Sequence, residues 1–425
     1  MSGSLVHLAA VGIQNGMVHG AEYTPFKCKI QKPSSFAREP KHVHFGGTVG
    51  YGTTQQVDID YHADLLTRVF MVLDVEATPT TDERFRDNTT KNGKIKCAED
   101  FMHALVKTIT LTVSGVEIEK ITGQYLHIRD TFYMKDSHKS TEWTGRTSSG
   151  GGDDAKTSSL IPFQTNRFYM DIPFWFTKEH CQALPLVAMH LSKMRVGWTF
   201  RNLNEMVIAF DGGSGASAET SLADCMKLKQ LNLLGEYVYL DDRSRMVFAQ
   251  IEHHFLVEQV QEVTHTLKAG DTSHKIKLDL SHMVKCLWWC ARATDKAASL
   301  DYFDFTGYED GSEYGSREGD LFHTAQITLN NNERVKPHDP LYYRLVQPHV
   351  HYVENVPDEF VYMYSFALYP QKHAPSGALN HSRIENAHLV LKTKALTTDM
   401  EFFLYGTNYN IVTIKAGVHS ILFSS

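Results

Sequence analysis

Short runs in which apolar and polar residues alternate, or in which β-branched and aromatic residues follow one another, recur along most of the chain. Successive side chains of a strand point to opposite faces of a sheet, so such runs are typical of β-strands. They occupy residues 54–75, 104–121, 274–293, 359–370, 388–397 and 408–423. The pattern predicts a mainly β protein.

Helical patterns are few and short. The segment 240–250 is the best of them, because Asp241 can cap its N-terminus and Asp242 lies in the first turn, where negative charge is favourable. The segment 177–191 is a second candidate, but Pro185 restricts any helix there to short pieces. We therefore expect an all-β fold with short helices.

Long polar stretches separate the expected strands. They are rich in Thr, Ser, Gly and Asp, and one also carries several aromatic residues. Loops of this length are usually functional or disordered in a compact domain. We expect them to face solvent at one end of the molecule, at residues 76–100, 135–159 and 294–320.

The two halves of the chain are weakly alike. Each places a long polar loop before a strand that contains Ile-Thr-Leu, at 109–111 and at 327–329. Between the halves, the run FDGGSGASAETS has the small residues of a linker. The pattern favours two tandem all-β sandwiches of the jelly-roll kind. The expected organisation is an N-terminal domain, a linker and a C-terminal domain at 1–205, 206–232 and 233–425.

Composition and charge narrow the possible functions. The 425 residues suffice for about two to three domains at roughly 150 residues each. The net charge of −7 provides no basic field, so we expect no direct contact with nucleic acid. The six cysteines are too scattered for a disulfide framework and fit a reducing compartment. No run reaches the ~18 apolar residues of a membrane-spanning helix, and the N-terminus lacks the basic region of a secretory signal.

Twenty-three histidines raise the question of a metal site. Two histidines at positions i and i+2 of a strand share a face and could bind one ion. Histidines that only pack or form hydrogen bonds are far more common than ligands, and we expect no metal site. The pairs considered are His42 with His44, His253 with His254, and His349 with His351.

These histidines raise one hypothesis, kept as the alternative function: a two-domain cupin-like protein. Such a protein would be a metal-dependent enzyme or binding protein whose barrel is also a jelly roll. His349 and His351 come close to the first cupin motif, but Glu354 stands one residue too early. In the second motif, His381 stands one residue too late, with Asn380 in its place. A slip of one residue turns a strand side chain to the opposite face, so the spacing disfavours this alternative.

Other candidate chemistry has a structural explanation. Cys286 and Cys290 could supply half a zinc site, but no second pair lies at metal spacing, so we expect buried free thiols. The glycine run at 149–156 lacks the Ser/Thr and the helix of a phosphate-binding loop. Asn88 is a formal glycosylation acceptor in an expected loop, and Asn380 is a second one that we expect to be inaccessible. We expect no catalytic residue and no cofactor.

The C-terminal run 342–391 resembles the signature of the major capsid proteins of nucleocytoplasmic large DNA viruses, the double jelly-roll family that includes iridovirus and phycodnavirus members. The matching residues form a strand ending Tyr-Ser-Phe-Ala-Leu, a turn and a following corner. They are Tyr364 to Leu368, Pro375 to Gly377, Asn380, Ser382 to Ile384, and Asn386 with Ala387. Further similar segments are 5–15, 115–128, 172–196, 233–261 and the last 22 residues, LYGTNYNIVTIKAGVHSILFSS.

This resemblance implies two tandem eight-stranded antiparallel jelly rolls with long loops, and a structural role without enzyme activity. It implies a homotrimer whose six jelly rolls form a nearly hexagonal capsomer that tiles an icosahedral shell. Partners would be neighbouring capsomers, minor capsid and penton proteins and, indirectly, an inner viral membrane. The protein would be located in the virion after assembly in the host cell cytoplasm.

The corner motif makes sense without catalysis. Pro375 fixes one backbone angle, and Gly377 tolerates a positive φ, so the chain can turn sharply. Asn380, Ser382 and Arg383 can form hydrogen bonds to loop backbone that would otherwise be buried unpaired. We expect these residues, together with Asn386, to hold a structural corner.

Overall fold

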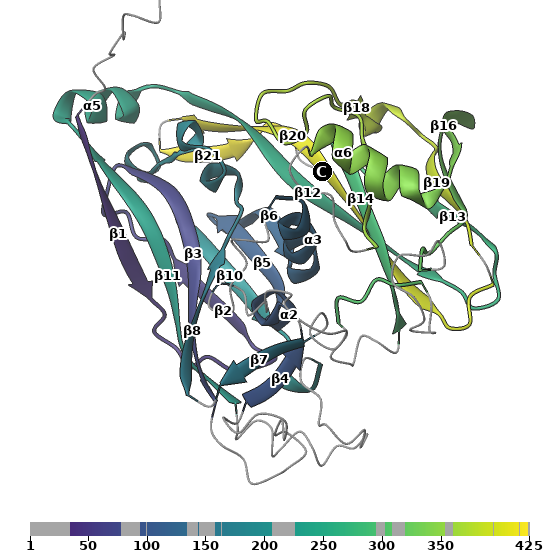
Figure 1. Cartoon of the computed structure of the whole chain (residues 1–425). Helices are drawn as coiled ribbons and strands as arrows, with labels where there is room; N and C mark the ends of the chain where they lie inside the picture. Colours follow the sequence, from purple (N-terminus) through teal and green to yellow (C-terminus); the bar gives the residue numbers. More distant parts are fainter. Residues whose placement is uncertain are drawn as a thin grey trace, which may run out of the picture. The chain divides into compact units, whose positions relative to one another are not determined.

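The computed structural model has two β-sandwiches in tandem, one in each half of the chain (Figure 1). Residues from Ala37 onward belong to one unit by their contacts. The described residues are 35–77, 94–98, 100–133, 143, 158–162, 164–205, 226–294, 302–307, 319–352, 360–393, 395–415 and 417–423.

The first sandwich contains two sheets with four strands each along their main paths. One sheet has the order β1 (Phe36–His44), β11 (Met226–Leu240), β3 (Leu65–Ala77) and β8 (Thr165–Asp171), with β9 (Leu184–Pro185) also on β3. The other has the order β2 (Thr54–Asp58), β10 (Met194–Phe200), β5 (Val106–Val113) and β6 (Val116–Thr122). A separate ribbon pairs β4 (Lys94–Ala98) with β7 (Ser158–Pro162).

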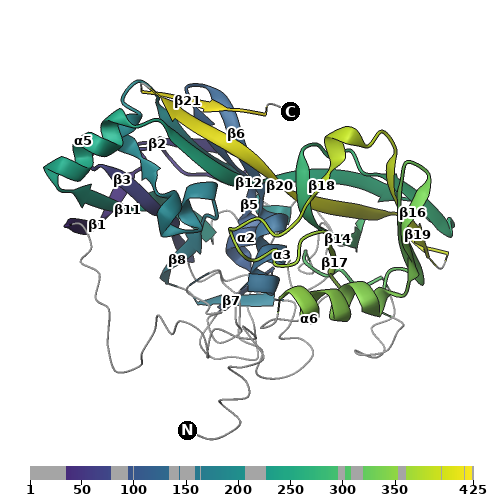
Figure 2. The ribbon, with the colours of Figure 1, turned by 90° about the horizontal axis from the view of Figure 1, so that it is seen from above.

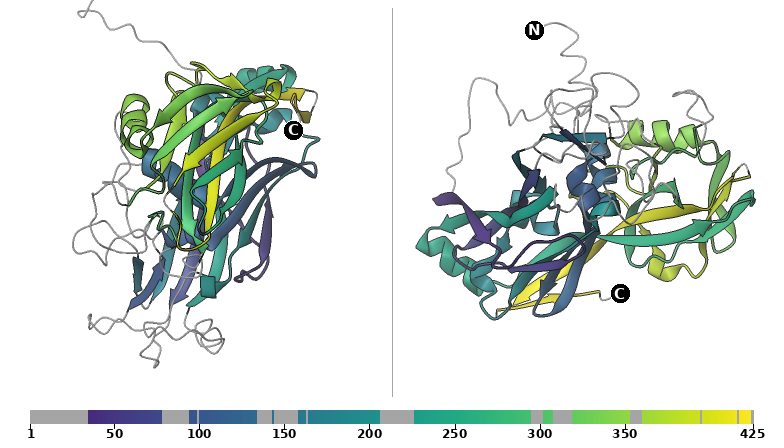
Figure 3. Two further views of the ribbon diagram at one scale, coloured as in Figure 1. Left: turned by 90° about the vertical axis from the view of Figure 1, so that its right-hand side faces the viewer. Right: turned by 90° about the horizontal axis from the view of Figure 1, so that it is seen from below.

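The second sandwich repeats this plan. One sheet has the order β12 (His253–Leu267), β20 (Met400–Lys415), β14 (Met283–Ala293) and β17 (Tyr362–Ser365), with β18 (Leu379–Asn380) on β14 and β21 (Val418–Ile421) on β20. The other has the order β13 (Ser273–Lys277), β19 (Ala387–Lys392), β15 (Thr324–Leu329) and β16 (Asn332–His338). Figure 3 lets the reader follow the two sandwiches by colour, purple to teal and then green to yellow. The expected pair of eight-stranded antiparallel sandwiches is confirmed.

The position of β11 differs from the expected domain organisation. Residues 226–232, expected to be part of the linker, lie in β11 and pair with β3 of the first sandwich. Their alternating side chains complete the first core, since Met226, Leu228, Leu231 and Leu233 are buried there. The strand pairing therefore favours a division at helix α5 (Asp242–Gln250), and residues 206–225 lie outside the described residues.

Helix α5 forms as the sequence predicts. The Asp241 side chain accepts a hydrogen bond from the backbone N–H of Ser244 at 3.3 Å, which caps the helix. The segment 177–191 contains the two-residue strand β9 and short 3₁₀ turns in place of an α-helix, as Pro185 suggests: η5 (His180–Gln182) and η6 (Leu186–Ala188). Other 3₁₀ turns are η4 (Trp175–Thr177), η7 (Leu203–Glu205) and η10 (His381–Arg383).

Other helices do not follow from the pattern. They are α2 (Phe101–Leu105), α3 (Gly123–Tyr133), the π-helical turn η9 (Tyr342–Val346) and α6 (Gln347–His351). In α3, polar residues such as Gln124 and His127 are buried together with apolar ones, so the helix has no polar face to reveal its period. Figures 1 and 2 show α3 beside β14 of the second sandwich.

Several expected strands are shorter or divided. The segments 104–121, 274–293 and 408–423 each contain parts of two strands. The segment 54–75 divides into β2 and β3, and in 359–370 only β17 is a strand. After β17 the chain turns, because the backbone N–H groups of Leu368 and Tyr369 donate to the backbone oxygen and the Oγ of Ser376. These local hydrogen bonds replace a continued strand ladder.

Candidate functional site

Strand β14 is buried on both faces, which makes it the centre of the contact between the two sandwiches. Leu287, Trp289 and Ala291 point into the second core. Cys286, Trp288 and Cys290 point the other way and join the core of the first sandwich. A continuous apolar run such as KCLWWCARA is typical of a strand covered on both sides. Cys286 and Cys290 are buried thiols outside any disulfide, as predicted.

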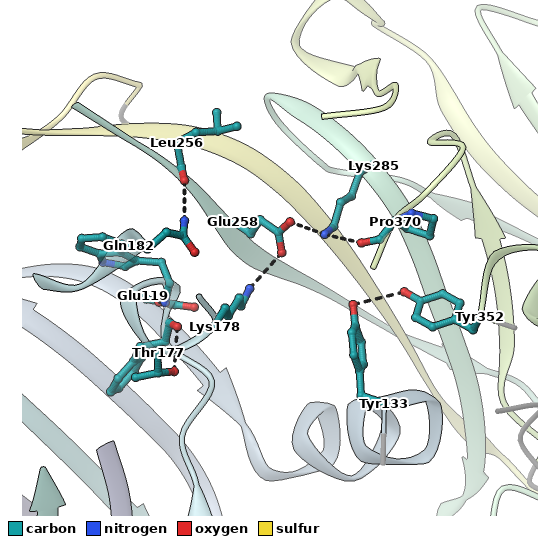
Figure 4. Close-up of polar contacts among 12 residues, drawn as sticks. Glu119, Tyr133, Thr177, Lys178, Gln182, Leu256, Glu258, Lys285, Tyr352 and Pro370 are labelled. Atoms are coloured by element: carbon teal, nitrogen blue, oxygen red, sulfur yellow. Dashed lines mark hydrogen bonds and ion pairs between the residues drawn. The ribbon is translucent and has the colours of Figure 1, made fainter. Parts of the chain in front are cut away.

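Helix α3 supplies the aromatic side chains that cover this face of β14. Trp288 stacks on Phe132 with ring centroids 5.6 Å apart, and Tyr125 also stacks on Trp288 at 5.6 Å. The Tyr133 and Tyr352 hydroxyls lie 3.5 Å apart (Figure 4). Burial raises the pKa of Tyr352 well above its usual value, so its phenol stays neutral. Aromatic pairs of this kind contribute about 0.5–1.5 kcal/mol each beyond the area they bury.

Beside the aromatic contact lies a buried group of three charges (Figure 4). Glu258 of β12 accepts hydrogen bonds from Lys285 of β14 and from Lys178, which follows η4 of the first sandwich, the latter at 3.1 Å. Lys285 also donates to the carbonyl oxygen of Pro370 at 2.8 Å. Burial alone would raise the pKa of Glu258, but the two ammonium groups outweigh it and hold the pKa at about 2. Glu258 is therefore ionised and links the two sandwiches.

Glu119 of β6 is a second buried carboxyl group in this region. Its Oε2 accepts a hydrogen bond from the backbone N–H of Trp175 at 3.2 Å, while Oε1 is buried without a partner among the described residues. Burial raises its pKa to about 7, although Lys178 and the Trp175 N–H act against this. Glu119 can thus bind a proton near neutral pH.

Two glutamine side chains complete the contact by binding backbone carbonyls across it. Gln182 Nε2 donates to the Leu256 oxygen at 2.8 Å, and Gln259 Nε2 donates to the Ile118 oxygen at 2.8 Å. We call the contact between the two sandwiches, formed by β14, α3 and Glu258 with its two lysines, the sandwich junction. Its groups are paired with each other or held neutral by burial, an arrangement suited to fixing two bodies together.

The sandwich junction was not predicted from the sequence. One signal was available: Lys285 stands inside the apolar run of β14, and a charged residue is almost never fully buried unless it is paired. Its partners Glu258 and Lys178 could not be chosen from the sequence, because they come from a distant strand and from a loop of the other sandwich.

The turn of the expected corner motif has the predicted backbone. Gly377 has a φ of 138°, and a Cβ added there would lie 2.9 Å from the carbonyl oxygen of Phe366. Pro375, two residues earlier, is exposed. Ser376 between them binds the backbone of Leu368 and Tyr369. A side chain at position 377 would therefore meet both backbone strain and a steric clash.

The rest of the motif holds the chain next to β14. Asn380 Oδ1 accepts from the Ser382 N–H at 3.1 Å, and Ser382 Oγ accepts from the His282 N–H at 2.8 Å. Asn386 contributes through its backbone, which exchanges hydrogen bonds with Asn330. Arg383 differs from the expectation: its side chain is exposed, and within the described part of the chain no hydrogen bond or ion pair from it is found. Asn88 lies outside the described residues.

The histidine pairs do not form the metal site of a cupin. His349 and His351 lie in helix α6 and not in a strand, so two positions apart they no longer share a face. The ring of His351 is within 3.0 Å of the Leu368 oxygen. Glu354 lies outside the described residues.

The other two pairs bond to groups near them. His44 Nδ1 is 2.8 Å from Asn232 Oδ1, His253 Nε2 is 2.7 Å from the Phe248 oxygen, and His254 Nδ1 is 3.2 Å from Thr413 Oγ1. Sequence analysis missed a different cluster, Asp100 with His103 and His127. The available signal was a repeated spacing, Asp-x-x-His at 100–103 and His-x-x-Asp at 127–130.

In the described part of the chain, no helix has the length and apolar character needed to cross a membrane.

Comparison with known proteins gives consistent matches along almost the whole chain. Residues 24–241 match the family model described as major capsid protein N-terminus, and residues 244–420 match the model described as large eukaryotic DNA virus major capsid protein. The chain is 28% identical to the major capsid protein of Pyramimonas orientalis virus and 25% identical to that of Paramecium bursaria Chlorella virus 1, with all of each chain covered.

Solved structures show the same fold. A quasi-atomic model of the PBCV-1 virus capsid matches with a TM-score of 0.74 at 22% identity, covering 95% of this chain and all of that one. The Faustovirus major capsid protein matches with a TM-score of 0.72 at 12% identity, covering 97% of each chain. The two sandwiches are thus the double jelly roll of these proteins.

Proposed function

The chain belongs to the major capsid protein family of large eukaryotic DNA viruses, and from this premise we propose that three copies form a homotrimer that tiles an icosahedral shell. The protein is a structural component of the virion and not an enzyme. Three chains with two sandwiches each give six similar bodies around one axis. Such a block has a nearly hexagonal outline and meets similar neighbours on every side.

The observation that carries this proposal is the sandwich junction. A hexagonal block requires that the two sandwiches of one chain keep a fixed relation, because a flexible pair would not present matching edges. Trp288 and the Glu258 group are buried between the sandwiches and provide this rigidity. Protein interiors transmit strain and do not deform continuously, so a buried junction keeps its geometry under load.

Exposed apolar side chains on the second sandwich support contact with a second copy of the chain. Leu345, Val346 and Val350 of η9 and α6 are exposed, as are Leu368 and Tyr369 in the loop that contacts His351. We call these five residues the α6 patch. Clustered exposed apolar side chains are typical of protein interfaces. We propose that the α6 patch is covered by a neighbouring chain in the trimer.

Light scattering of the native protein tests this proposal. The expected mass is three times the chain mass of 48.2 kDa. Replacing Val350, which is 59% exposed, by glutamate should shift the protein toward the monomer without changing its circular dichroism. Val116→Glu is a matched control, because Val116 is 62% exposed on the first sandwich. A wild-type monomer at micromolar concentration contradicts the trimer, and a trimeric Val350→Glu variant contradicts the role of the patch.

Further proposals rest on the resemblance to the family. We propose contacts with neighbouring capsomers and with minor capsid and penton proteins, an indirect relation to an inner viral membrane, and assembly in the host cell cytoplasm. The net charge of −7 supports the absence of direct nucleic-acid binding. We also propose that the long loops face solvent, that Asn88 is open to glycosylation, and that Pro375, Gly377, Asn380, Ser382 and Asn386 serve as a structural corner.

A further inference from the structure

A cluster of metal-ligand side chains is buried where helices α2 and α3 meet. Asp100 immediately precedes α2, His103 lies in α2, and His127 lies in α3. One ligand atom from each residue can be chosen so that all three atoms lie within 4.8 Å of one another. The exposed fractions of Asp100, His103 and His127 are 1%, 1% and 0%. Polar side chains so fully buried require partners, so their grouping needs an explanation.

The cluster is built from two matching spacings that face each other. The chain has Asp100-x-x-His103 at the start of α2 and His127-x-x-Asp130 within α3. His127 Nδ1 lies 2.6 Å from Asp100 Oδ2, and His103 Nε2 lies 3.5 Å from Asp130 Oδ2. Each histidine thus faces the carboxylate of the opposite helix.

One nitrogen of this cluster has no partner among the residues that the structure describes. His103 Nδ1 is buried there without a hydrogen bond, and Asp100 Oδ2 is 3.9 Å away. That distance is too long for a hydrogen bond. Asp100 occupies the N-cap position of α2, yet its side chain does not cap the helix and is directed toward the histidines. The unpaired nitrogen and the carboxylate therefore face the same point.

We propose that His103 Nδ1, His127 Nδ1 and the Asp100 carboxylate bind one divalent transition-metal ion, with Zn²⁺ as the best match. Two imidazoles and a carboxylate are a common ligand set for Zn²⁺. The ion would replace the proton in the hydrogen bond between His127 Nδ1 and Asp100, and that proton would move to Nε2 of the same ring, so that the imidazole stays neutral. It would also give the unpaired nitrogen of His103 a partner.

Asp130 has a supporting role in this arrangement. It faces His103 Nε2, the ring nitrogen that does not face the cluster. A carboxylate on the outer nitrogen fixes the orientation and tautomer of a metal-binding histidine. On the other side, the ring of Phe303 stacks on His127 with centroids 3.9 Å apart and excludes water. Phe303 belongs to the long segment between β14 and β15, so the ion would also stabilise the contact with the second sandwich.

The experiment measures the metal content of the full-length purified protein and its response to Zn²⁺. Elemental analysis should find about one transition-metal ion per chain, and removal of the ion with dipicolinate should lower the melting temperature until Zn²⁺ is added back. His103→Gln and His127→Gln should abolish both effects. Asp130→Asn should weaken Zn²⁺ binding by roughly 10–100-fold without abolishing it.

A matched control separates this site from other histidines. His254→Gln and the double variant His349→Gln/His351→Gln change histidines outside the cluster and should retain the ion. Loss of the ion in these controls, or its retention in His127→Gln, would overturn the proposal. If the cluster variants do not fold, the wild-type protein decides. Zn²⁺ binding with thermal stabilisation and a nitrogen–oxygen ligand set in X-ray absorption supports the site, whereas no binding and no stabilisation leaves a hydrogen-bonded His–Asp network only.

Discussion

Replacing Glu258 by glutamine removes the negative charge that holds two lysines at the sandwich junction. Lys178 retains access to water, because 21% of its side chain is exposed, so it contributes little to the cost. Lys285 is 2% exposed and keeps the carbonyl oxygen of Pro370, the face of the Tyr409 ring at 5.8 Å and a neutral amide oxygen in place of the carboxylate. Breaking a buried ion pair by removing one partner costs about 3–5 kcal/mol. Because these contacts of Lys285 remain, we expect a loss at the lower end, about 3 kcal/mol.

This loss corresponds to a modest change in melting temperature. At about 2.1 cal/mol/K per residue, unfolding of 425 residues as one unit has an entropy near 0.9 kcal/mol/K, so the midpoint should fall by about 3 °C. Differential scanning calorimetry at neutral pH measures this. The control is Asp399→Asn, which breaks the exposed Lys268–Asp399 pair of 2.9 Å and should leave the midpoint unchanged.

Acid pH gives an independent check on the same reasoning. The folded pKa of Glu258 is about 2, below its usual value of 4.5, so its stabilising contribution is present above pH 4.5 and is lost as the pH falls toward 2. The gap between wild type and Glu258→Gln should be constant from pH 7 to about 5 and narrow below that. Equal midpoints for Glu258→Gln and Asp399→Asn at neutral pH would refute the proposed role of the buried charges.

Three further predictions follow from other sites. Gly377→Val should lower the free energy of unfolding by about 1–3 kcal/mol in urea titrations, because φ is positive there and Cβ would contact the Phe366 oxygen. The control Gly270→Val also has a positive φ but has open space around it, so its loss of unfolding free energy should be smaller. Stability should fall as the pH rises from 4.5 through about 7, because folded Glu119 holds a proton that the unfolded chain releases, and Glu119→Gln should flatten this slope in calorimetry. Limited proteolysis of assembled particles should cut within 76–100, 135–159 or 294–320 before it cuts within 359–391.

Strands were the part of the fold that the sequence revealed best. Alternation is a local signal, and β5, β13 and β19 keep the apolar and polar faces that their sequences suggest. Helix α3 was not predicted because it is buried on nearly every side and so lacks separate apolar and polar faces. Its polar residues Gln124, His127 and Asp130 are buried as well. Helix α6 was not predicted because His349 and His351, two residues apart, resemble the alternating pattern of a strand.

Part of the corner motif could be predicted from the sequence, whereas the ion pairs of the sandwich junction could not. The positive φ of Gly377 follows from a local preference of glycine, so it could be predicted. The exposure of Arg383 could not be predicted, since an arginine in a loop has many possible acceptors on other segments. Long-range pairing such as Lys178 with Glu258 depends on the tertiary arrangement of segments 80 residues apart.

The two-sided burial of β14 has a consequence for synthesis on the ribosome. Helix α3 ends at Tyr133, whereas β14 begins at Met283, which is 150 residues later. At about 5–20 residues per second, the aromatic face of α3 waits roughly 8–30 s for Trp288 to emerge and cover it. The first sandwich is complete only once β11 has been made, at Leu240, and from then until Trp288 emerges it presents Tyr125 and Phe132 to the surrounding medium. The first half of the chain therefore leaves the ribosome with an exposed apolar surface, which the second half later buries.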